Sequence, residues 1–114
     1  MGERSAKKIL PNIKFSYLYR DAGNYKNYGE VIFANPDEIS LEELERLIKL
    51  KLIDGQWFYA KDWEIPDLHF DKWNEDLDHG FHEFDILSYT DGIITASFSV
   101  SHFFKLVSEL DRRY

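Results

Sequence analysis

The residues best suited to chemistry lie in one run, Asp76-Leu77-Asp78-His79-Gly80-Phe81-His82-Glu83. Imidazole and carboxylate groups are ordinary ligands for zinc and manganese, and crowded acids favour a cation. His79 and His82 would share a face on a helix, but on a strand they point to opposite faces. A metal site on His79, His82 and Glu83 therefore needs a further ligand, such as His69 or another acid. The alternative is a solvated acidic loop in which one histidine bonds to a backbone carbonyl.

The same cluster is suited to general acid–base work, because a histidine beside carboxylates has a tunable pKa. The chain has no cysteine, which excludes thiol catalysis and cysteine-ligated zinc. It also lacks the HExxH, P-loop, GxGxxG and GxSxG patterns. We interpret the protein as non-enzymatic and expect no cofactor. The alternative is a metal-dependent or acid–base enzyme that uses His79, His82 and Glu83.

A second candidate site is the turn Tyr19–Tyr28, where Arg20 and Lys26 flank amide and phenol groups. Such a turn is suited to binding an anion or a planar ligand. The alternative is a structural turn in which Asp21 and Asn24 act as caps and Gly23 takes a positive φ. The candidate ligand-binding residues are Arg20, Asp21, Asn24, Tyr25, Lys26 and, from the later aromatic stretch, Trp73.

Aromatic residues make up 17% of the chain and gather in its middle. They are suited either to a ligand-stacking or partner-binding surface or to the core of a small domain. The residues concerned are Trp57, Phe58, Tyr59, Trp63, Phe70 and Trp73.

The net charge of −7 lies in one segment. Residues 64–85 hold eight acids and one lysine, and the rest of the chain holds 13 acids and 13 bases. This distribution argues against nucleic acid as a partner. We therefore predict a protein-binding or regulatory module with an acidic, aromatic-rich loop.

The hydrophobic pattern predicts a small α+β fold of three to four mostly antiparallel strands with two helices packed on one face. Ser40 and Glu43 form a capping box, which predicts the start of the first helix. The predicted strands are Ile13–Arg20, Tyr28–Ala34, a short aromatic stretch at Gln56–Lys61 and Phe81–Tyr89, and the predicted helices are Leu41–Lys51 and Ser99–Arg112. The predicted core is Phe15, Tyr17, Ile32, Leu44, Leu47, Ile48, Phe84, Ile86, Phe104 and Val107.

With 114 residues the chain is expected to form one domain, residues 11–114, behind a flexible tail of residues 1–10. No apolar run approaches the ~20 residues of a membrane span, and the first residues contain no secretory signal. We therefore expect a cytoplasmic protein with a protein partner and with no nucleic-acid or membrane partner. A homodimer through an unpaired strand is compatible with this pattern.

Four motifs together resemble a family of small bacterial proteins of uncharacterised function. They are Tyr19-Arg20-Asp21-x-x-Asn24-Tyr25-Lys26, Gly29 before a Val/Ile strand, Leu52-Ile53-Asp54-Gly55 with a following aromatic residue, and Asp78-His79-x-x-His82-Glu83-Phe84. The resemblance spans about residues 15–84 and implies a shared fold and a cytoplasmic bacterial setting, without any activity, cofactor or catalytic residue. It also leads us to expect that the Arg20–Lys26 turn faces the His79–Glu83 run.

Overall fold

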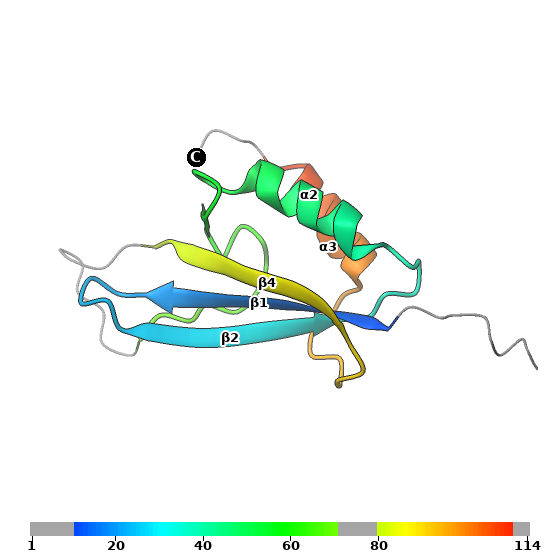
Figure 1. The fold of residues 1–114 in the computed structure, drawn as a ribbon, viewed down its shortest axis with the longest axis horizontal. Coiled ribbons are helices and arrows are strands. Elements are labelled where there is room, and N and C mark those ends of the chain that lie inside the picture. Colours follow the sequence, from blue (N-terminus) through cyan, green and yellow to red (C-terminus); the bar gives the residue numbers. More distant parts are fainter. Residues whose placement is uncertain (1–10, 71–79, 111–114) are drawn as a thin grey trace, which may run out of the picture.

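The computed structural model describes residues 11–70 and 80–110, which form a four-stranded antiparallel sheet and two helices (Figure 1). The strand order is β2-β1-β4-β3. Both helices lie on the same side of the sheet (Figure 1), so the predicted α+β architecture is confirmed. The elements are β1 (Asn12–Arg20), β2 (Lys26–Phe33), α2 (Leu41–Lys51), β3 (Trp57–Phe58), β4 (His82–Thr90) and α3 (Val100–Ser108). The predicted tail, Trp73 and His79 lie outside the described residues.

Helix α2 has the bounds that the capping box predicts. The Ser40 side chain accepts a hydrogen bond from the Glu43 backbone N–H at 3.1 Å, which satisfies one of the open donors of the first turn. Leu44 and Ile48 face the sheet and are fully buried. Helix α3 begins in the same way, with Ser99 as its cap. It ends at Ser108 and is therefore shorter than the predicted helix, Ser99–Arg112.

A β-bulge in β4 makes one core prediction wrong. Ser16 of β1 faces Ile86, whereas the next residue, Tyr17, faces Phe84, so Asp85 is an extra residue in β4. The bulge reverses the alternation of side chains along the strand. Phe84 and Leu87 therefore both point toward the helices, and Ile86 points to the opposite face with 56% of its surface exposed.

The core is built mainly from aromatic rings between the sheet and the helices. The ring of Phe15 lies 5.4–6.1 Å, centroid to centroid, from five other rings. These rings belong to Tyr17, Phe58, Trp63, Phe84 and Phe103. Of the other predicted core residues, Leu44, Ile48 and Val107 are buried, and Leu47 and Phe104 are partly buried against the core. Ile32 is buried as well, but on the other face of the sheet, where it pairs with Lys14 and not with a core residue.

One end of the free edge of β2 is covered by the segment before α3. The backbone N–H groups of Thr95 and Ala96 both donate to the Ile32 carbonyl at 3.0 Å, and the Thr95 hydroxyl accepts from the Ile32 N–H at 2.9 Å. The backbone of Ile32 therefore points away from β1. Within the described part of the chain, no helix has the length and apolar character needed to cross a membrane.

Candidate functional site

The Arg20–Lys26 turn is organised by a single carboxylate. Asp21 Oδ1 accepts from the backbone N–H groups of Gly23 and Tyr25, both at 2.9 Å. Asn24 takes the positive φ of the turn, 69°, in place of Gly23, where we predicted it. Asn has a short polar side chain that tolerates this conformation. The side chain of Tyr25 is 72% exposed, so its ring stands open to solvent at the turn.

Arg20 leaves the turn and crosses the sheet to β4. Its Nε donates to Glu83 Oε2 at 2.8 Å and its Nη2 donates to Glu83 Oε1 at 3.1 Å, which makes a two-pronged ion pair. Its Nη1 donates to Asn24 Oδ1 at 2.6 Å. The hydrogen bond to Glu83 raises the pKa of Arg20 above its usual range. The Arg20–Lys26 turn was expected to face the His79–Glu83 run, and it does so at Glu83. Arg20 makes this contact, and Lys26 does not.

The ion pair borders a shallow cavity of about 370 Å³, which we call the Arg20 groove. Glu83 faces Trp57 across the β3–β4 ladder, so the ion pair and the indole share one face of the sheet. The Trp57 ring stacks on Phe81 with centroids 6.1 Å apart and an interplanar angle of 29°. Gln56 also lines the groove, and its backbone carbonyl accepts from the Phe84 N–H at 3.1 Å. The groove therefore combines a fixed guanidinium with an aromatic wall.

His82 points to the opposite face and is 1% exposed. Its Nε2 accepts a hydrogen bond from the Leu68 backbone N–H at 2.9 Å. The His82 ring packs between Tyr17 and Tyr19, with centroids 5.9 and 5.3 Å away. His82 therefore anchors the segment that contains Leu68 against the helix side of the sheet.

Asp67 and His69 complete this inner cluster. Asp67 Oδ1 lies 2.5 Å from His69 Nδ1 and 3.4 Å from His82 Nε2. Partial burial of Asp67 opposes ionisation, but hydrogen bonds from the backbone and side chain of His69 outweigh it and lower the pKa of the carboxyl. Tyr17 donates its hydroxyl to the Pro66 carbonyl at 2.6 Å. Burial, followed by the charge of Asp67, raises the pKa of that phenol.

The predicted metal-ligating residues are not gathered on one face. Glu83 is held by Arg20 on the outer face, and His82 lies inside with the lone pair of Nε2 already occupied. Among the residues that the structure describes, no three His, Asp or Glu side chains form a group that could hold a metal ion. His79, the third predicted ligand, lies outside the described residues.

The central aromatic residues divide between the two roles that the sequence left open. Phe58 and Trp63 are fully buried core residues. Trp57 lines the Arg20 groove instead. Neither Gln56 nor Phe81 was predicted as a site residue. The only sequence signal for them is their place at the start of two predicted strands, and their meeting with Arg20 depends on long-range strand pairing.

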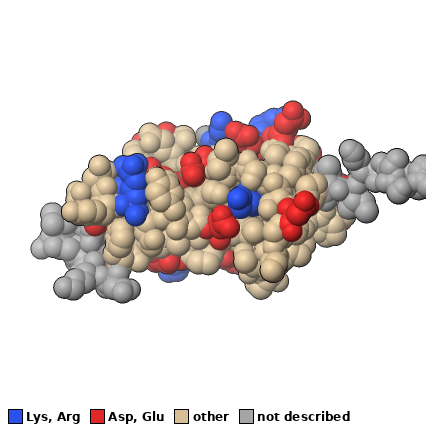
Figure 2. Space-filling view, turned by 60° about the horizontal axis from the view of Figure 1, so that its bottom comes forward, with Lys and Arg blue, Asp and Glu red and all other residues tan. Residues whose placement is uncertain are grey.

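Acidic and basic side chains are interspersed on the face shown in Figure 2. Four of the eight acids of residues 64–85 lie outside the described residues, namely Asp71, Glu75, Asp76 and Asp78.

Comparisons with protein-family models, with curated proteins and with solved structures give no match for this chain.

Proposed function

We propose that the protein is a non-enzymatic binding module that contacts a protein partner through the Arg20 groove. The observation that carries the proposal is the Arg20–Glu83 pair held beside the stacked rings of Trp57 and Phe81. Arginine and tryptophan are the side chains that most often dominate the binding energy of protein interfaces. A guanidinium that is already fixed loses little side-chain entropy when a partner binds.

The hydrogen bonds of Arg20 define the chemistry of the partner group. A guanidinium has five N–H donors, and three of them bond to Glu83 and Asn24. The other two, one on Nη1 and one on Nη2, have no acceptor among the described residues. Since Glu83 already neutralises the charge, these donors suit an uncharged acceptor such as a backbone carbonyl. The aromatic wall suits an apolar side chain next to that carbonyl, so the preferred ligand is an exposed peptide loop.

Affinity capture from bacterial cytoplasm, compared between variants, tests the proposal. Trp57→Ala removes half of the stacked pair and should weaken binding by about 2 kcal/mol, roughly 30-fold. Arg20→Lys keeps the charge but loses the fork geometry, so the same captured protein should be depleted. Ile93→Ala is the control, because Ile93 is 85% exposed and is not part of the groove lining.

One protein captured by the wild type and by Ile93→Ala, and lost by both groove variants, would support this function. Capture of the same proteins by all four would contradict it. Circular dichroism should show the same folded spectrum for every variant.

The alternative proposal is a metal-dependent or acid–base enzyme on the His82 side of the predicted His79, His82 and Glu83 cluster, since Glu83 is held by Arg20 on the other face of β4. The short Asp67–His69 contact beside His82 favours its acid–base form, because a carboxylate orients the imidazole. Calorimetric titration with zinc or manganese tests the metal form. Heat at micromolar metal that His69→Asn abolishes would support it, and the absence of heat and of any thermal shift would remove it.

A further inference from the structure

The outer edge of β2 carries backbone groups that the described sheet leaves unpaired. In an antiparallel ladder, successive residues direct their N–H and C=O groups alternately to the two sides of the strand. Ile32 directs both groups away from β1, where Thr95 and Ala96 bind them. The pairing of β1 with β2 has no register shift. Lys26, Tyr28 and Glu30 therefore direct their backbone groups to the same free edge as Ile32.

The side chains of these three residues follow a self-complementary pattern. Lys26, Tyr28 and Glu30 all project from the outer face and are exposed, Tyr28 by 62%. If two β2 strands pair antiparallel with Tyr28 facing Tyr28, then Lys26 of each copy faces Glu30 of the other. Opposite charges in facing positions stabilise an antiparallel pair. Lys26 has no ion-pair partner among the described residues, and Glu30 has only a 3.8 Å contact with Lys14.

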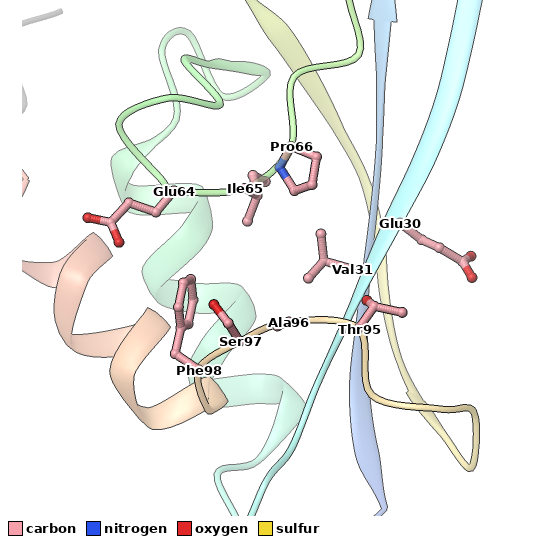
Figure 3. A pocket seen from close by; sticks show the side chains of 9 residues that line it. All are labelled: Glu30, Val31, Glu64, Ile65, Pro66, Thr95, Ala96, Ser97 and Phe98. Atoms are coloured by element: carbon pink, nitrogen blue, oxygen red, sulfur yellow. The ribbon is translucent and has the colours of Figure 1, made fainter.

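The groove at the end of this edge fits the same arrangement (Figure 3). It has a volume of about 370 Å³, and Val31, Ile65 and Phe98 are among the residues that line it. A register that centres on Tyr28 places Tyr25 of the second copy opposite Val31, at the mouth of the groove. Tyr25 is 72% exposed in the single chain, and docking would cover its ring.

The two ends of the free edge limit the pairing to a short segment. Thr95 and Ala96 cover the edge at Ile32, and the Asp21–Tyr25 turn ends the strand on the other side. We infer that a second copy of this chain pairs with β2 along Lys26–Glu30 and extends the sheet into a continuous eight-stranded sheet across a two-fold axis. Because the paired segment is short, the dimer should form at tens of micromolar, far weaker than an obligate interface.

Sedimentation velocity over about 1 μM to 1 mM, with charge-swapped variants, tests this dimer. Lys26→Glu places like charges opposite each other at both ends and should raise the dissociation constant by at least about tenfold. The double variant K26E/E30K exchanges the two charges and should restore the dimer. Lys61→Glu changes the net charge equally at an exposed residue away from β2 and should dimerise as the wild type does.

A second measurement reads the backbone directly. Amide hydrogen exchange at Tyr28 and Glu30 should slow by at least about tenfold between dilute and concentrated wild type, because these amides become paired only in the dimer. A wild type that stays monomeric up to 1 mM would overturn the inference, since Lys26 and Glu30 would then only protect the edge. A Lys26→Glu variant that dimerises normally, or a folded double variant that stays monomeric, would overturn it as well.

Discussion

Replacing Tyr17 by Phe tests how the segment around Pro66 is held on the helix side of the sheet. The Tyr17 hydroxyl donates to the Pro66 carbonyl at 2.6 Å, and the side chain is 1% exposed. The substitution removes one oxygen and leaves the ring packing against Phe15 and Phe58 in place. A hydrogen bond of this kind contributes about 1 kcal/mol to the free energy of unfolding. At pH 7 the variant should therefore melt about 4 °C lower than the wild type.

The same substitution should cost less stability at high pH. Burial raises the pKa of Tyr17 in the folded protein above 10.0, its ordinary value. The unfolded chain therefore releases the proton first, so stability is fully present below pH 10 and falls as the pH rises above it. Up to the raised folded pKa, the loss approaches about 1.4 kcal/mol per pH unit for one group. Tyr17→Phe lacks this loss, so the two stabilities should become equal near pH 11, where the loss in the wild type offsets the roughly 1 kcal/mol that the variant lacks at pH 7.

Urea unfolding of both proteins at pH 7 to 11 measures this crossing. Tyr28→Phe is the matched control, since Tyr28 is 62% exposed and its hydroxyl bonds to no described residue. The control should stay within about 0.5 kcal/mol of the wild type at every pH. A difference between Tyr17→Phe and the wild type that stays constant up to pH 11 would refute the claim that Tyr17 is kept neutral by burial.

Three further substitutions test single features of the fold. Hydrogen bonds lower the pKa of Asp67, so its contribution to the stability of the wild type is present above pH 3.8 and is lost as the pH falls below that value. Asp67→Asn should therefore lose less stability than the wild type when both are unfolded by acid. Ser40→Ala should cost about 1 kcal/mol in thermal unfolding, because the first turn of α2 loses its cap. Because the bulge buries Leu87 and exposes Ile86, Leu87→Ala should lower the free energy of unfolding in urea by about 2–4 kcal/mol and Ile86→Ala by less than about 0.5 kcal/mol. Similar losses for the two variants would contradict the register.

The helix-forming signals in this sequence are local, and they predicted structure well. Ser40 and Glu43 define the start of α2 within four residues of sequence, and the apolar spacing of Leu44 and Ile48 defines its buried face. The period of two in β1 is also local, and it placed Phe15 and Tyr17 on the core side. These elements required no knowledge of distant partners.

The parts that sequence did not predict depend on how strands pair. Phe84 and Ile86 read as regular alternation, and only the register against β1 reveals the extra residue between them. The Arg20 groove depends in the same way on the β3–β4 ladder, which brings Trp57 opposite Glu83 although 26 positions separate them. The pairing itself is set by the packing of the whole core, so no local pattern records it.

The geometry of β4 also explains why the candidate site differs from the motif that suggested it. His82 and Glu83 are neighbours in the chain, and successive side chains of a strand point to opposite faces. His82 therefore joins the inner cluster that anchors the Leu68 segment, and Glu83 fixes Arg20 on the outside. A single site that used both side chains would require the strand to break at this point, with loss of the ladder to β1 and β3. The same short run thus stabilises the fold on one face and prepares a binding surface on the other.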